Sequence, residues 1–185
     1  MKYLIAGLGN IGPEYELTRH NVGFLTLDRL ADKNNITFNT ARYSDTAMLK
    51  YKGRQIHLIK PNTYMNLSGK AISYWLQELK ILRENLLVIV DDFALPFGCL
   101  RLRNNGSHAG HNGLKNIEEC LNSPLYPRLR FGIGNNFGKG MQVEFLLSRF
   151  ETTELEAITP SLDKACDIIF SFCTIGIDKT MNQYN

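Results

Sequence analysis

A chain of 185 residues with 44% hydrophobic residues can bury one substantial core but is short for two domains, so we expect one domain over residues 1–185. The formal net charge of +3 permits a polyanionic partner without requiring one, and the chain has no like-charge run typical of a disordered arm. The four cysteines lack metal-site spacing, and no signal peptide or apolar window of about 18 residues is present, which predicts a cytoplasmic protein with free thiols and no membrane segment.

Short apolar runs predict the strands. The runs at residues 3–6, 56–59 and 86–90 lack polar alternation, which is typical of strands covered on both faces. The segment 37–51 is expected to form a hairpin with residues 55–59 across a Lys-Gly turn, and residues 129–133 form a further strand. The hairpin makes the sheet mixed rather than wholly parallel.

Apolar residues at helical spacing lie between these runs. They predict helices around Val22, Leu25 and Ala31, over residues 71–79 and 114–121, and from about residue 161 to 172. Alternating strands and helices indicate an α/β fold. Residues 135–140 (NNFGKG) are predicted to form a mobile loop.

Residues 7–12, GLGNIG, fit the dinucleotide-binding pattern G-x-G-x-x-G. In a dinucleotide unit the helix begins directly after the glycines, and an acidic residue about 20 positions on ends the next strand. Here a polar run precedes the helix, and Asp28 and Asp32 lie within or at the end of it. We therefore expect no nucleotide cofactor, and interpret the stretch as a strand-end turn that presents Asn10, with a purely structural turn as the alternative.

Other polar segments follow predicted strands or precede helices. His20 could take a proton from water, and Asp91 or Asp92, at the end of a buried strand, could orient an imidazole. The amides of Asn10, Asn66 and Asn112 could grip a carbonyl or an oxyanion. Taken singly, each residue could equally be a turn former, a helix cap or a solvent-facing side chain.

Metal and covalent chemistry are not expected. His108 and His111 have no acidic or thiol partner at ligand spacing, so we predict no metal site. The chain has no G-x-S-x-G motif and no cysteine in an electropositive motif. Water is therefore the expected nucleophile.

Basic residues recur in pairs two positions apart. Arg101 with Arg103, and Arg128 with Arg130, would each share one face of an extended segment, while Lys50 lies near the hairpin tip. They could be solvated charges, or they could contact the phosphates of a nucleic acid without reading its bases.

Taken together and in this order, the segments resemble bacterial-type peptidyl-tRNA hydrolases over nearly the whole chain. The matching motifs are GLGN-x-G-x-x-Y (7–15), TRHN-x-G (18–23), KP-x-TYMN-x-SG (60–69), LP-x-G (95–98), GHNGL (110–114) and R-x-R-x-GIG (128–134). Two positions depart from the family pattern. Ile11 replaces a usual Pro, which should only loosen the turn, and Ala94 replaces a common Asp, which puts any role of that second carboxylate in doubt.

The resemblance implies a monomeric α/β protein with a mixed, twisted sheet flanked by helices. It implies hydrolysis of the ester between a peptide and the 3′-terminal ribose of tRNA, without a cofactor, so that tRNA is recycled for translation. His20 would be the general base, Asp91 its orienting carboxylate, and Asn10 a third catalytic residue. A non-catalytic RNA-binding protein on the same scaffold is the alternative.

The resemblance also implies two sets of binding residues. Substrate-binding positions are Tyr15, Asn21, Tyr64, Met65, Asn66, His111 and Asn112. Contacts to tRNA phosphates are Arg101, Arg103 and Arg130, to which the spacing adds Arg128 and Lys50.

Overall fold

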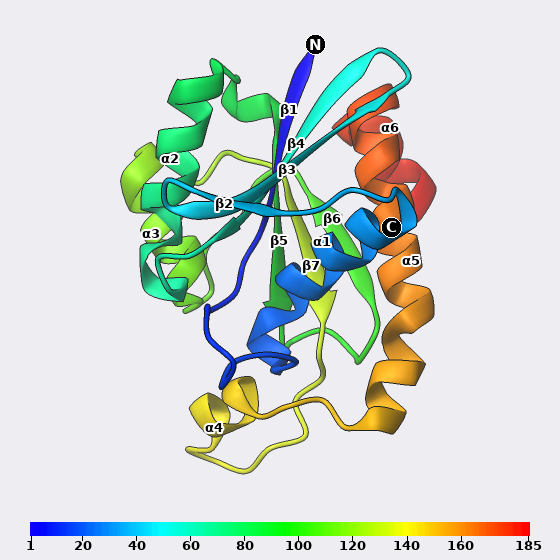
Figure 1. The fold of residues 1–185 in the computed structure, drawn as a ribbon. Coiled ribbons are helices and arrows are strands. Elements are labelled where there is room, and N and C mark those ends of the chain that lie inside the picture. The colour runs from blue at the N-terminus through cyan, green and yellow to red at the C-terminus, as the bar shows by residue number, and fades with distance from the viewer.

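One seven-stranded sheet runs through the computed structural model, which describes residues 1–185 (Figure 1). Its strand order is β2-β3-β4-β1-β5-β7-β6. The strands β1, β4, β5 and β7 are parallel, whereas β2, β3 and β6 pair antiparallel with their neighbours. The predicted α/β fold with a mixed sheet is therefore confirmed. The strand bounds are β1 (Lys2–Gly7), β2 (Asn39–Ala41), β3 (Ser44–Tyr51), β4 (Arg54–Pro61), β5 (Leu86–Asp92), β6 (Leu100–Arg103) and β7 (Arg128–Gly132).

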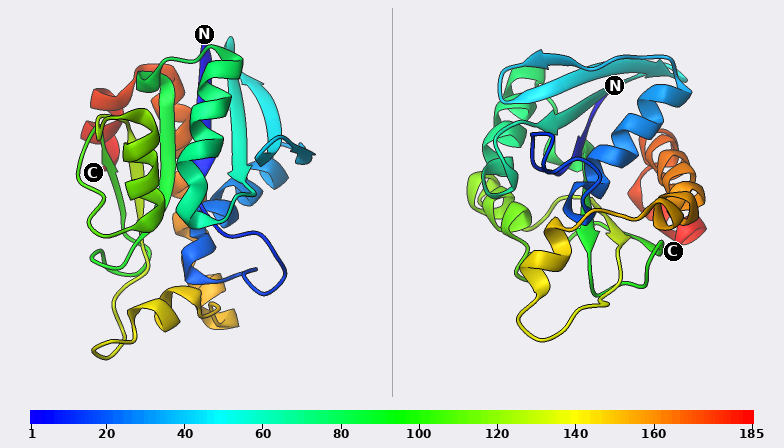
Figure 2. Two further views of the ribbon diagram at one scale, coloured as in Figure 1. Left: turned by 90° about the vertical axis from the view of Figure 1, so that its left-hand side faces the viewer. Right: turned by 60° about the horizontal axis from the view of Figure 1, so that its bottom comes forward.

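Helices cover both faces of the sheet (Figure 2). On one face lie α2 (Ser68–Leu79) and α3 (Asn112–Leu121), and on the other lie α1 (Val22–Lys33), α5 (Thr152–Ile175) and α6 (Ile177–Tyr184). The short helix α4 (Gln142–Leu147) lies beyond the carboxyl ends of the parallel strands (Figure 1). None of the helices combines the length and the apolar character that crossing a bilayer requires.

Each face of the sheet has its own core. In β1, Tyr3 and Ile5 join a cluster of 25 buried residues on the side of α1 and α5, whereas Leu4 and Ala6 join a cluster of 14 on the side of α2 and α3. Because both faces are covered, neither set of alternate positions can be polar. This explains the apolar runs from which the strands were predicted.

The glycine stretch is a strand-end turn, as interpreted. Gly7 ends β1, and a Cβ there would collide with the carbonyl oxygen of Gly23, so the glycine lets α1 pack directly against the strand. The first helical residue after the stretch is Arg19, in a short 3-10 helix, and no helix begins at the glycines. The stretch therefore lacks the helix N-terminus that a bound pyrophosphate requires.

The prediction for the C-terminal third was incomplete. The helix expected over residues 161–172 extends from Thr152 to Ile175 and contains Pro160. A capping box between Glu151 and Glu154 starts it about two and a half turns earlier than predicted. The segment 37–51, expected as one arm of the hairpin, forms two strands, since β2 turns back on β3 and only β3 pairs with β4. The strand β6 and the helices α4 and α6 were not predicted, because all three are short.

Candidate active site

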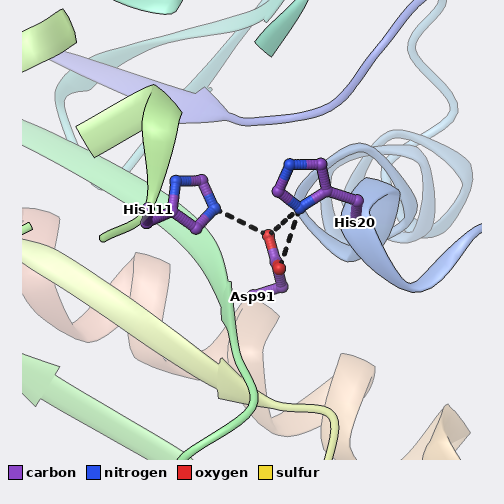
Figure 3. A group of neighbouring side chains, drawn as sticks. All are labelled: His20, Asp91 and His111. Atoms are coloured by element: carbon purple, nitrogen blue, oxygen red, sulfur yellow. Dashed lines mark hydrogen bonds and ion pairs between the residues drawn. The ribbon is translucent and has the colours of Figure 1, made fainter. Parts of the chain in front are cut away.

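Three polar side chains meet at the carboxyl end of the sheet (Figure 3). Asp91 lies near the end of β5, His20 lies in the 3-10 helix that leads into α1, and His111 directly precedes α3. The side chain of Asp91 is only 1% exposed, and those of His20 and His111 are 11% and 12% exposed. The fold thus brings together residues that are 71 and 20 positions apart in the sequence.

The contact with Asp91 fixes the tautomer of His20. Nδ1 of His20 lies 3.0 Å and 2.9 Å from the two carboxylate oxygens of Asp91. An ionised carboxylate can only accept, so Nδ1 carries the proton and donates it. In the neutral ring Nε2 then has a free lone pair, which is the arrangement that a general base needs.

His111 uses both of its ring nitrogens within the protein. Its Nδ1 accepts the backbone N–H of Gly113 at 3.1 Å, so its Nε2 must carry the proton in the neutral ring. Nε2 donates to Oδ1 of Asp91 at 2.9 Å. The sequence placed His111 among the substrate-binding residues, but did not indicate that it is the second donor to the carboxylate.

The surroundings shift the pKa of both members of the His20–Asp91 pair. Burial of His20 opposes its charged form, but the Asp91 carboxylate beside it outweighs burial and holds the pKa of the imidazole above its usual value. Burial alone would raise the pKa of Asp91, but the two imidazoles hold it well below its usual range. Asp91 therefore stays ionised near neutral pH, and its two oxygens already accept from the imidazoles.

The same three residues are the one cluster whose donor atoms could reach a metal, since those atoms lie within 4.8 Å of one another. Sequence spacing offered no acidic partner for His111, and that reasoning was wrong because the fold supplies Asp91. The hydrogen bonds nevertheless disfavour a metal. If Nε2 of His111 bound an ion while Nδ1 still accepted from Gly113, the ring would have to lose both protons and become an anion.

Asn10 is held with one side-chain group free. Its Oδ1 accepts the backbone N–H of Met65 at 2.7 Å, so its Nδ2 remains available as a donor. Asn21 holds the Asn10 backbone from both sides, accepting its N–H at 2.8 Å and donating to its carbonyl at 2.9 Å. Asn21, which the sequence placed at the substrate, therefore spends both polar groups of its side chain on positioning Asn10.

Tyr64 directs Met65 toward Asn10 through an unusual backbone conformation. Its φ of 61° and ψ of 162° are a combination that glycine adopts far more readily than tyrosine. Its side chain is exposed, and its ring meets Tyr15 edge to face with 6.4 Å between the centroids. Tyr15, Tyr64 and the exposed Asn66 thus gather on the Asn10 side of the site.

A cavity of about 180 Å³ opens onto the two histidines and Asp91. Asn112 and Arg130 also line it, as the sequence led us to expect of binding residues. His108, which the sequence analysis considered only as a metal ligand, lines it as well. Phe93 and three side chains of α4, namely Gln142, Val143 and Leu146, line it without having been predicted. Asn10 and Asn21 line a separate, adjacent hollow of about 610 Å³.

The arginines of β6 and β7 share one face of the sheet. Arg101 pairs in register with Arg130, and Arg103 with Arg128, while the residues between them enter the core on the other face. Arg103 is exposed, and Arg130 lies at the cavity, where its Nη1 is 3.4 Å from Asp92. Of the three predicted phosphate contacts, Arg130 therefore lies at the cavity, and Arg101 and Arg103 continue the row along β6 away from it.

The prediction that Arg128 contacts phosphate was wrong. Arg128 is fully buried, with its guanidinium stacked 4.0 Å from the Tyr126 ring centroid, and it donates to the carbonyl of Pro124 at 2.6 Å. Glu118 of α3 lies 3.7 Å away. Lys50 is exposed, but its hairpin tip lies beside the amino end of β1, at the opposite end of the sheet from Asp91.

Comparisons with known proteins identify the family of this chain. Residues 4–185 match the family model described as peptidyl-tRNA hydrolase. The chain is 57% identical to the peptidyl-tRNA hydrolase of Phocaeicola vulgatus, over 100% of this chain and 99% of that one, and 41% identical to that of Clostridium botulinum, over 99% and 96%. The crystal structure of the Acinetobacter baumannii peptidyl-tRNA hydrolase superposes with a TM-score of 0.91 at 33% identity, covering 99% of this chain and 94% of that one. The chain therefore belongs to the peptidyl-tRNA hydrolase family.

Proposed function

We propose a mechanism for the hydrolysis of peptidyl-tRNA in which His20 activates the attacking water. Membership of the family over almost the whole chain makes peptidyl-tRNA hydrolysis the activity of this protein. The bond to be broken is the ester between the C-terminal carbonyl of the peptide and an oxygen of the 3′-terminal ribose. The roles given below to single residues rest on the geometry of the site.

His20 serves as base and then as acid. Its free Nε2 takes a proton from water while the water oxygen forms a bond to the ester carbonyl carbon, giving a tetrahedral intermediate. When the bond from that carbon to the ribose oxygen breaks, Nε2–H returns the proton to the ribose oxygen. The products are a free peptide acid and tRNA with its terminal hydroxyl restored.

Asp91 supports both steps through the bonds described above. Its contact with Nδ1 of His20 at 2.9 Å keeps the proton on Nδ1 and stabilises the imidazolium that forms when Nε2 is protonated. His111 donates to the same carboxylate at 2.9 Å and fixes its orientation. His111 thus acts on the reaction through Asp91 rather than by a polar contact with substrate.

Asn10 is the proposed donor to the oxyanion. Its Oδ1 is committed to Met65, so its Nδ2 can donate to the carbonyl oxygen as negative charge develops there. The exposed amides of Asn66 and Asn112 could hold the peptide backbone, with Tyr15 and Tyr64 forming an apolar side of the peptide site. Arg101, Arg103 and Arg130 would contact tRNA phosphates and position the acceptor end.

We further propose a single-domain, cytoplasmic monomer that needs no metal or cofactor. The steps above are the addition of water to the carbonyl carbon, the departure of the ribose oxygen and two proton transfers through His20. None of them changes an oxidation state, and side chains of this protein are proposed for each. Activity that persists after treatment with a chelator would support this, and activity that returns only when a divalent metal is added would refute it.

The observation that carries the proposal is the buried His20–Asp91 contact, which leaves Nε2 of His20 free. The test is release of the peptide from an N-blocked aminoacyl-tRNA by catalytic amounts of protein. Turnover well above one product per protein molecule is expected. A protein that binds this tRNA but releases no peptide would instead be the non-catalytic RNA-binding protein.

A further inference from the structure

The residue before the proposed base, Arg19, has a buried guanidinium with a dense set of partners. Its side chain is 11% exposed. Nη1 donates to Oγ of Ser148 at 2.8 Å and to the carbonyls of Arg149 and Ser148 at 2.7 Å and 3.3 Å. Nη2 donates to both carboxylate oxygens of Glu154, at 2.8 Å and 2.9 Å. All of these partners lie in or near the connection from α4 to α5.

Aromatic rings pack against the same guanidinium. Its Cζ lies 4.8 Å from the ring centroid of Phe145 in α4 and 5.3 Å from that of Phe150 in the connection. Arginine is suited to such a position because its planar group can stack on rings and bind a carboxylate with two nitrogens, and lysine can do neither in the same way.

The backbone joins the same two segments. The N–H of Arg19 donates to the carbonyl of Ser148 at 3.0 Å, and the N–H of Phe150 donates to that of Leu17 at 2.8 Å. Thr18 and Arg149 form an isolated antiparallel bridge between them. The segment that carries His20 is therefore bound to the α4–α5 connection over three successive residues.

The helix α4, which precedes this connection, forms part of the cavity wall. Val143 and Leu146 of α4 line the cavity together with His20 and Asp91, but no residue of α4 is itself buried. A helix of six residues with so little burial depends on its anchors for a fixed position. Arg19, through Phe145 and Ser148, is such an anchor.

We propose that Arg19 is a positioning residue that holds His20 and α4 in one rigid unit. This inference rests on the proposed role of His20 as the base. A small displacement of the His20 segment would disturb both the bond from Nδ1 to Asp91 and the direction of Nε2, and misplacement by about 1 Å can cost about 10²-fold in rate. Substrate contacts made by other parts of the site would change less.

The test compares Arg19→Met and Glu154→Gln with the control Arg29→Met. Arg29 binds both oxygens of Asp163 at 2.8 Å and 3.1 Å, and so ties α1 to α5 by a similar pair of hydrogen bonds away from the cavity. Two readouts are needed: kcat and KM on N-blocked aminoacyl-tRNA, and the low-field NMR signal of the His20 Nδ1 proton, assigned with a His111 variant. Circular dichroism establishes that each variant is folded.

We expect Arg19→Met to lower kcat at least about tenfold with a smaller change in KM, and to broaden or shift the Nδ1 signal. Glu154→Gln should have the same effects more weakly. Arg19→Lys should have a kcat between those of Arg19→Met and the wild type. Arg29→Met should leave kcat and KM within about twofold of the wild type and the Nδ1 signal unchanged. If Arg19→Met does not fold, Glu154→Gln decides the question.

A folded variant with wild-type kcat and an unchanged Nδ1 signal would overturn the proposal, as would an equal kcat loss in Arg29→Met. If the wild-type protein released no peptide at all, the proposed mechanism would fail. The NMR comparison would still decide whether Arg19 positions His20.

Discussion

The ring centroids of the His20 and His111 imidazoles lie 5.0 Å apart, and both rings donate a hydrogen bond to the carboxylate of Asp91. The two rings are not equivalent. His111 has its second nitrogen bound by the backbone of α3, whereas the second nitrogen of His20 is free. This difference supports the proposal that His20 exchanges a proton with water while His111 orients the carboxylate.

The pH dependence of the reaction should report His20. The base must be unprotonated, and the Asp91 carboxylate outweighs burial and raises the pKa of His20 above 6.5. We therefore expect kcat/KM to rise with pH through a midpoint above 6.5 and to fall about tenfold per pH unit below it. Steady-state kinetics between pH 5 and 9 measure this, and a midpoint well below 6.5 would contradict the role of Asp91.

Asp91→Asn should lower activity and move this midpoint in the opposite direction. Without the negative charge, burial remains and lowers the pKa of His20. The acid limb of the pH profile, where kcat/KM rises with pH, therefore shifts to lower pH. The plateau of kcat/KM above the midpoint should also fall, by up to about 10⁴-fold as in comparable triads, because an amide does not keep the proton on Nδ1 of His20. An unchanged plateau would show that His20 needs no oriented partner.

His111→Asn tests the second donor with its helix cap preserved. Asparagine is a good N-cap for α3 but is too short to keep the bond to Asp91. With one donor fewer, the carboxylate holds the His20 proton more strongly, so the acid limb should move to higher pH while the melting temperature changes little. An acid limb that does not move would show that the bond from His111 to Asp91 has no influence on the His20–Asp91 pair.

Arg103→Gln and Arg128→Gln should behave in different ways, although both residues lie on one face of adjacent strands. Arg103 is exposed, so its loss should raise KM and reduce the slope of log KM against log salt by about 1. Arg128 is buried against Tyr126 and Glu118, so its loss should cost about 1–3 kcal/mol of unfolding free energy and leave the salt slope unchanged. Urea unfolding and kinetics at several salt concentrations separate the two, and a reduced slope in Arg128→Gln would contradict its burial.

The parts of the fold with strong periodic signals could be predicted from the sequence. The runs that became β1 and β5 are apolar at every position because helices cover both faces of the sheet, and His57 is the one polar residue in the run that became β4. The helices α2 and α3 have a clear apolar face. Asn10, which follows β1, and Asp91, near the end of β5, could also be singled out, because parallel strands bring their carboxyl ends to one edge.

The remaining features depend on contacts that no local pattern reveals. The burial of Arg128 comes from Tyr126 and from Glu118 on α3, so its spacing from Arg130 was misleading. The bond from His111 to Asp91 joins residues on different elements, and Arg19 gains its partners from residues 145–154, about 130 positions away. Such pairings become visible only when the chain is folded.

The most direct test of the mechanism is His20→Ala on an N-blocked aminoacyl-tRNA. We expect kcat to fall by about 10² to 10⁴-fold, while the affinity for the tRNA, measured with an uncleaved substrate, stays close to that of the wild type. Turnover that equals that of the wild-type protein would show that another group activates the water.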